Sequence, residues 1–338
     1  MKYLTIVVPC FNSEAYMQRC LDSLLEGGDK VEILVVDDGS SDGTGEIADE
    51  YQRRFPHMIT SIRQENRGHG GAVNTGLEHA SGLFFKVVDS DDWIQAGALK
   101  EILSKIEEWE SAETSVDMIV SNYTYNHLHE GTCQEIDYRN IFTPEVPCSW
   151  EESKRFAPSQ YLVMHALIFR TAVLRDSGVD LPRHTFYVDN LFAYQPLPRV
   201  NTICYLDHDF YHYFIGRDDQ SVNEKVLCER IDQHIRVTKS VIDCVDLRSV
   251  ASERLRSYML RNVSIMMSIS SIHLLLINSQ DAIAKRDDLW EYAKKRMPHA
   301  YKRLRFTHLS GFTYLPTRFG RWLTITGYRA AKRMYRFQ

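Results

Sequence analysis

Residues 3–88 alternate between short apolar runs and segments with helical spacing, and this alternation limits the fold more than any other feature of the chain. Strand-like segments, predominantly apolar except for the third, lie at 3–8, 32–36, 58–63 and 83–88. Strands that are apolar throughout, with helices between them, are typical of a parallel sheet covered on both faces. We therefore predict an α/β fold for residues 1–110.

The remaining sequence forms two further parts. Residues 117–125 and 201–213 have strand-like patterns, so we expect 111–224 to belong to the same domain as 1–110. Residues 225–338 show helical segments and no convincing strand. One apolar segment, 263–277, contains four serines and a histidine, and it is shorter than the roughly twenty residues that a membrane span needs. We predict a buried core helix there.

The cysteines bear on the cellular compartment. The seven cysteines are irregularly spaced and form no CxxC pair, which argues against a disulfide framework or a zinc site. The apolar stretch near the N-terminus ends at Pro9 and is too short for a signal peptide. With 44% hydrophobic and 25% charged residues, the chain has the composition of an ordinary globular protein, and we expect it in the cytoplasm.

The C-terminal segment is strongly basic. Residues 292–338 hold twelve of the 40 Lys and Arg residues and none of the 45 Asp and Glu residues. Within it, 317–337 has helical spacing, with apolar residues on one side and basic residues on another. The apolar set is Phe319, Trp322, Leu323, Ala330, Met334 and Phe337, and the basic set is Arg318, Arg321, Arg329, Lys332 and Arg336.

Such a helix fits an anionic membrane interface. The alternative is a helix that packs on the rest of the protein and leaves its basic side in water. Nucleic acid is not an expected partner, because the remainder of the chain is acidic and contains no nucleic-acid-binding module.

Acidic residues follow two of the predicted strands. Asp37 and Asp38 follow the second, and the stretch DSDD, residues 89–92, follows the fourth. Ligands of open α/β sheets bind beyond the carboxyl ends of the strands. Carboxylates crowded there repel one another unless a cation such as Mg²⁺ or Mn²⁺, which prefers oxygen ligands, neutralises them. We therefore predict a cation site, with helix capping at a surface turn as the alternative.

Between these clusters lies a glycine-rich stretch, ENRGHGGAVN, residues 65–74. Glycines let the backbone approach a ligand closely, and the N-terminus of the helix that follows favours phosphate. A turn without a ligand explains the glycines nearly as well. The stretch matches neither GxGxxG after a first strand nor GxxxxGK[ST], so neither a dinucleotide fold nor a P-loop is predicted.

Four stretches in this order, IVVPCFNSE, VEILVVDDGSSDGT, ENRGHGGAVNTGLEHASG and VVDSDDW, resemble the family-2 glycosyltransferases of the GT-A fold. The resemblance is strong over residues 3–95 and weaker to about residue 225. It implies a GT-A-type, mostly parallel sheet flanked by helices, with a C-terminal helical extension. Residues 1–110 would bind a nucleotide-diphospho-sugar, UDP-linked by expectation, and 111–224 would form the acceptor side.

The resemblance also implies roles for residues near the donor. Pro9 and Phe11 would begin the nucleotide pocket, and Asp38 would bond the base. Arg67 lies where such enzymes contact the nucleotide or the diphosphate.

The same resemblance gives Asp89 and Asp91 the part of a DxD motif that serves the ribose and a divalent cation, Mn²⁺ or Mg²⁺. Asp92 would share the metal, because the string DSDD permits either alignment. Arg217 and Ser221 match a late segment near the donor phosphates, for which a solvated loop is the alternative.

Family-2 enzymes invert the anomeric carbon and need a carboxylate base, commonly within a Glu-Asp pair. Here the best match is Val188-Asp189, so Asp189 is the candidate base and a helix cap is its alternative role.

His165 lies in the apolar stretch YLVMHALIF and is expected to be a core histidine rather than an acceptor contact. The QxxRW signature of processive members is missing, which favours one added sugar per acceptor.

The function implied is an inverting, metal-dependent glycosyltransferase of bacterial surface-polysaccharide synthesis. Its acceptor would be a hydroxyl of a glycan or of a lipid-linked saccharide, and its location would be cytoplasmic and peripheral at the inner face of the membrane. The alternative is a catalytically inactive protein of the same fold that binds a sugar nucleotide. A sugar-1-phosphate nucleotidyltransferase would need a glycine-rich loop after the first strand, where this chain has PCFNSEAY.

Overall fold

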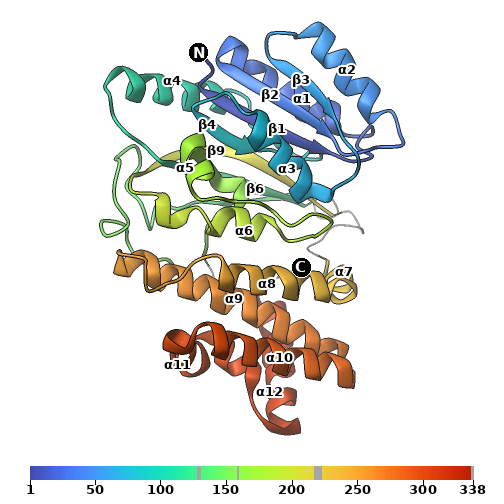
Figure 1. Cartoon of the computed structure of the whole chain (residues 1–338), viewed down its shortest axis with the longest axis vertical. Helices are drawn as coiled ribbons and strands as arrows, with labels where there is room; N and C mark the ends of the chain where they lie inside the picture. The colour runs from blue at the N-terminus through green and yellow to red at the C-terminus, as the bar shows by residue number, and fades with distance from the viewer. Residues whose placement is uncertain (128–130, 158–159, 217–222, 336–338) are drawn as a thin grey trace. The chain divides into compact units, whose positions relative to one another are not determined.

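The structure, a computed structural model, describes residues 1–127, 131–157, 160–216 and 223–335 (Figure 1). The chain divides into two compact units, residues 1–216 and 217–338, which are described separately.

The first unit is built on a nine-stranded sheet with the strand order β3-β2-β1-β4-β8-β6-β9-β5, and β7 pairs with β6. The parallel sheet predicted for residues 1–110 is confirmed, because the first four strands in this order run parallel. These strands are β1 (Leu4–Cys10), β2 (Val31–Asp37), β3 (Ile59–Arg63) and β4 (Phe84–Val87).

Helices flank this part of the sheet, as Figure 1 shows, and confirm the predicted α/β class. They are α1 (Met17–Leu24), α2 (Thr44–Arg54), α3 (Gly68–His79) and α4 (Ala98–Ser111), with the 3₁₀ helix η1 (Leu25–Lys30) after α1.

The second half of the unit makes the sheet mixed. Antiparallel pairs join β8 to β4 and β6, β7 to β6, and β5 to β9, whereas β6 and β9 run parallel. The strands predicted at 117–125 and 201–213 are confirmed. The strands of this half are β5 (Trp93–Ile94), β6 (Met118–His127), β7 (Thr132–Ile136), β8 (Leu167–Arg170) and β9 (Ile203–Ile215). Its short helices are η2 (Met164–Ala166), α5 (Thr171–Asp176), α6 (Asp189–Tyr194) and η3 (Leu197–Arg199).

The register of the central strands brings the predicted site together. All seven residues of β1 are buried, and its last residue, Cys10, pairs with Asp37 at the end of β2. Val7 of β1 pairs with Val87 at the end of β4. The segments that follow β1, β2 and β4 therefore leave the same edge of the sheet, as expected for a ligand site of an open α/β fold.

The second unit is helical, as predicted. It contains α7 (Glu224–Glu229), α8 (Ile231–Asp243), α9 (Glu253–Ile277), α10 (Gln280–Arg296), α11 (Pro298–Phe306), η4 (Leu309–Tyr314) and α12 (Thr317–Tyr335). The predicted core helix is confirmed, because α9 packs against the other six elements. By length and composition α9 could also cross a membrane, yet 61% of its most apolar stretch is buried.

Candidate active site

The DSDD stretch forms a tight turn that is bonded to β9. Asp92 N donates to the Asp89 carbonyl (3.0 Å), and the Asp92 side chain is 1% exposed. The Asp92 carboxylate accepts hydrogen bonds from Phe214 N (2.8 Å) and from Tyr211 Oη (2.6 Å), which itself accepts from Asp89 N (3.1 Å). These bonds fix the acidic turn against the far half of the sheet.

Two histidines face Asp89. Its Oδ1 lies 2.7 Å from His69 Nε2, and its Oδ2 lies 3.7 Å from His165 Nε2. Burial opposes ionisation of Asp89, but the two imidazoles hold the pKa of its carboxyl well below the usual range. Burial likewise opposes the charge on His69, and Asp89 nevertheless raises the pKa of His69. The two residues form an ion pair whenever the His69 imidazole is protonated.

Asp92 differs from Asp89 in its electrostatics. Burial raises the pKa of the Asp92 carboxyl well above its usual range, and the charges of Asp91 and Asp89 raise it further. A carboxylate in this position needs a compensating positive charge to stay ionised.

The residues around this turn fit a divalent cation. Ligand atoms of Asp89, Asp92 and His165 lie within 4.8 Å of one another. His165 Nε2 is buried and has no hydrogen-bond partner among the described residues. Carboxylate oxygens with one imidazole nitrogen suit Mn²⁺ and related ions. Asp91, the other predicted ligand, is not part of this group, and its metal role stays a prediction.

The apolar surroundings of His165 predicted a core histidine rather than an acceptor contact, and the structure places it among aromatic rings beside the acidic turn. It lies in η2, and the rings of Tyr213 and Tyr211 stand 4.5 Å and 4.8 Å from its own ring. The prediction did not include this neighbour: η2 leads into β8, which pairs with β4 and so carries His165 to the acidic turn. No local pattern in the sequence reveals this neighbour. A contact of His165 with an acceptor stays untested.

Lys86 is a further polar residue of the site, and sequence reasoning missed it. It is fully buried in β4, and its Nζ donates to the carbonyls of Met164 (3.1 Å), His165 and Leu167 (3.3 Å). Burial lowers the pKa of Lys86 to about 7, against the opposing influence of Asp89 and Asp92. The signal was visible in the sequence, since a lysine interrupts the apolar run FFKVV.

The predicted nucleotide-binding residues lie at the same edge of the sheet. Pro9 is buried within β1, and Phe11, which directly follows this strand, is 51% exposed. Asp38 is buried, and its carboxylate accepts from Arg67 N (2.8 Å) and Gly68 N (2.7 Å). Asp38 thus holds the loop that begins α3, and its predicted bond to a base stays a prediction. The Arg67 side chain is exposed.

The glycine-rich stretch makes close contact with a distant part of the chain. Gly68 has φ +75, and a Cβ there would lie 2.9 Å from the backbone of His184. His184 N donates to the Arg67 carbonyl (2.8 Å). A side chain at position 68 would therefore separate the loop before α3 from the segment that leads to Asp189.

Asp189 is the first residue of α6, and the segment before it is bonded to the loop before α3. His184 and Tyr187, which precede it, have φ values of 48 and 69, strained for residues other than glycine. Burial raises the pKa of the Asp189 carboxyl, which the charges of His165 and His69 lower in turn. Asp189 therefore shares the electrostatic environment of Asp89 and its histidines. Arg217 and Ser221 lie outside the described residues.

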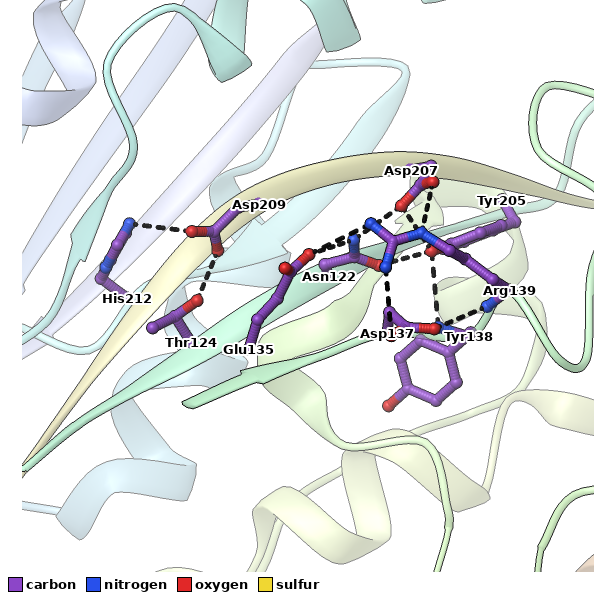
Figure 2. Close-up of polar contacts among 10 residues, drawn as sticks. All are labelled: Asn122, Thr124, Glu135, Asp137, Tyr138, Arg139, Tyr205, Asp207, Asp209 and His212. Carbon is purple, nitrogen blue, oxygen red and sulfur yellow. Dashed lines mark hydrogen bonds and ion pairs between the residues drawn. The ribbon is translucent and has the colours of Figure 1, made fainter. Parts of the chain in front are cut away.

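A polar network braces the strands beside the site (Figure 2). Asn122 on β6 donates to Asp207 on β9 (2.8 Å), and Arg139 donates to the same carboxylate (2.6 Å). Thr124 donates to Asp209 (2.8 Å), further along the same two strands. These bonds fix β6 and β9, and therefore the position of the tyrosines that surround His165.

Comparison with known proteins agrees with the resemblance to glycosyltransferases. A model of the family described as glycosyl transferase family 2 matches residues 5–174. The chain is 37% identical over 164 residues to the glycosyltransferase GlyA of Streptococcus pneumoniae serotype 4, which is 46% of this chain and 23% of GlyA. It is also 33% identical over 216 residues to EpsH of Bacillus subtilis (strain 168), whose name describes a glycosyltransferase. This match covers 63% of this chain and 60% of EpsH. The matches thus span less than two thirds of either relative.

Solved structures extend the likeness over the whole chain. The crystal structure of Staphylococcus aureus TarS 1–349 in complex with UDP-GlcNAc has a TM-score of 0.68 to this chain at 20% identity. The alignment covers 99% of this chain and 92% of that one. At this identity the likeness shows the fold alone, and it confirms the predicted GT-A-type architecture with its helical extension.

Proposed function

Since the chain belongs to glycosyl transferase family 2, we propose that it is an inverting, metal-dependent glycosyltransferase. It would move one sugar from a nucleotide-diphospho-sugar, UDP-linked by our expectation, to a hydroxyl of a glycan or lipid-linked saccharide. The setting would be surface-polysaccharide synthesis at the cytoplasmic side of a bacterial membrane. The observation that supports this proposal is that His69 and His165 stand 2.7 Å and 3.7 Å from Asp89, and that the charges of all three act on the Asp189 carboxyl.

Donor binding would use the acidic turn and the start of α3. Asp89, Asp92 and His165 would hold the divalent cation, with Asp91 beside them. When bound, the cation would neutralise charge on the donor's diphosphate. Arg67 stands at the N-cap of α3, where the partial positive charge of the helix end adds to that of its guanidinium.

Asp189 would be the catalytic base. As the acceptor oxygen bonds to the anomeric carbon, the bond from that carbon to the diphosphate oxygen breaks and Asp189 takes the hydroxyl proton. This single displacement inverts the configuration without a covalent sugar intermediate. A positioned base of this kind contributes about 10²–10⁴-fold to a rate. The neighbouring Val188 is 2% exposed and packs in the core, so Asp189 would act without a paired glutamate.

The test is a panel of nucleotide sugars incubated with the full chain, with and without Mn²⁺, while release of nucleoside diphosphate is followed. We expect slow hydrolysis of at least one donor, with loss of the activity when the cation is chelated. Calorimetric titration with the same donors runs in parallel. Donors that bind without turnover would favour the inactive sugar-nucleotide-binding protein, and a panel in which none binds or reacts would refute both readings.

A further inference from the structure

The last three elements of the second unit leave large apolar side chains in water. Of the eleven large hydrophobic residues that are exposed in the described part of the chain, six lie within residues 306–323. They are between 47% and 74% exposed. This set, called here the apolar surface, is Phe306, Leu309, Phe312, Phe319, Trp322 and Leu323.

Small polar residues occupy the inner side of the same elements. Ser310 and Thr324 are buried, although they are less apolar than their exposed neighbours. Ser310 Oγ lies 2.9 Å from Ser264 Oγ on α9, and Thr324 Oγ1 donates to the Phe312 carbonyl (2.8 Å). At Gly320, a Cβ would lie 2.7 Å from Leu315 Cβ. The packing of these elements is thus complete without the apolar surface.

Four of the six exposed residues lie close to one another. Phe319, Trp322 and Leu323 are spaced i, i+3 and i+4, which places them on one side of α12. The rings of Phe319 and Trp322 stack with centroids 5.7 Å apart. The bond from Thr324 to its carbonyl places Phe312 beside this helix. Contiguous apolar patches of this kind mark interaction sites in proteins.

Exposed basic residues lie in the same elements as the apolar surface. Lys302, Arg303, Arg318 and Arg329 are exposed, and residues 292–338 contain no acidic side chain. A second copy of the chain is a poor partner for this surface, because two segments with twelve basic residues each would repel one another. The partner must therefore offer both an apolar layer and negative charge.

We propose that the apolar surface and these basic residues bind the interface of an anionic lipid bilayer. Aromatic and aliphatic side chains would enter the boundary between headgroups and acyl chains, and the Arg and Lys side chains would meet the lipid phosphates. The α12 helix would lie in the plane of the interface. This inference goes beyond the proposed transferase activity and does not depend on it.

The test is co-sedimentation of the full chain with vesicles. One set is pure phosphatidylcholine, and the other is a mixture of phosphatidylcholine with phosphatidylglycerol. We expect binding to the mixed vesicles only, weakened by added salt. The double substitution Phe319→Ser and Trp322→Ser should weaken partitioning by about tenfold or more, because it removes two interfacial aromatic side chains.

Ile277→Ser, which alters an exposed apolar residue of α9 outside the apolar surface, is the matched control and should bind as the parent does. Thermal melts should coincide for all three proteins, because the changed side chains are exposed. Equal binding to both vesicle types, or full binding by the double variant, would overturn the proposal. So would a self-associated chain that the double substitution turns into monomers without any vesicle binding. Donor hydrolysis, measured alongside, would be unchanged in every variant.

Discussion

The two units bury polar side chains of different kinds. The first unit encloses charged groups, among them Asp38, Lys86 and Asp92. The second encloses mostly neutral ones, such as His234 and Ser270. His234 Nδ1 lies 2.8 Å from Ser270 Oγ. An exception is Arg286, whose guanidinium lies 5.0 Å from the centre of the Tyr314 ring.

The surface of the second unit is unusual for its exposed apolar side chains rather than for charged ones. The second unit exposes Phe306, Phe319 and Trp322, which a folding chain would ordinarily bury. The first unit therefore departs from the usual distribution by burying charged groups, and the second by exposing apolar ones.

A buried charge costs stability unless a partner compensates it. Asp38 and Lys86 have hydrogen-bond partners within the protein, whereas Asp92 fits a small cationic ligand. An exposed apolar cluster indicates a larger partner, because only an extended surface can cover it.

The largest expected effect is that of substituting Asp189 in the first unit, and it tests whether the charged groups of this unit serve a reaction. Asp189→Asn keeps the shape of the side chain and removes its capacity as a base, so donor turnover should fall by about 10²–10⁴-fold. Donor affinity, measured by calorimetry, should change little. Asp176→Asn, at an exposed carboxylate of α5, is the control and should retain the parental rate. Parental turnover in the Asp189 variant would remove this residue from the mechanism.

Substitution of Lys86 tests how much a buried charged group contributes to the stability of the first unit. Lys86→Met fills a similar volume but removes the Lys86 donor from the carbonyls of Met164, His165 and Leu167. The Met164 carbonyl keeps the hydrogen bond that Leu167 N donates to it. Because an unsatisfied buried group costs about 1–3 kcal/mol, we expect the free energy of unfolding in urea to fall by about 1–3 kcal/mol.

Binding of Mn²⁺ should weaken in the same variant, because Lys86 holds the segment that carries His165. Lys100→Met, at an exposed lysine of α4, should stay within about 0.5 kcal/mol of the parent. If the Lys86 and Lys100 variants unfold and bind Mn²⁺ alike, Lys86 has no positioning role.

The effect that is smallest near pH 7 concerns the neutral histidine of the second unit. Burial, aided by His273, lowers the pKa of His234 to about 3, so the unfolded chain binds a proton more readily than the folded chain below the usual pKa of about 6.5. Stability should therefore fall as the pH decreases from about 6.5 towards 3, by up to about 1.4 kcal/mol per pH unit. Urea titrations of the parent and of His234→Asn should diverge over this range, and parallel pH profiles would contradict the assignment.

Local signals explain what the sequence could predict. The apolar strands and the acidic residues after them are contiguous in the chain, so both the parallel sheet and the acidic turn could be inferred. Asp189 could be placed only by resemblance, since it follows no predicted strand. The residues 67–68 and 184 that anchor its segment are distant in sequence from one another.

Non-local pairing explains what could not be predicted. His165 and Tyr211 reach Asp89 and Asp92 through the pairing of β4, β8, β6 and β9, which no stretch of residues encodes by itself. The strand β7 was missed because its residues are polar and mostly exposed. The amphipathic pattern of 317–337 indicated a membrane interface, but Phe306, Leu309 and Phe312 belong to short elements without a readable period.

The hydrogen bond from His184 N to the Arg67 carbonyl has a mechanical consequence. The backbone that would meet the donor's phosphates and the backbone that carries the proposed base touch directly, with Gly68 leaving no spacer between them. A displacement of the Arg67–Gly68 backbone would therefore be passed on to the segment that leads to Asp189.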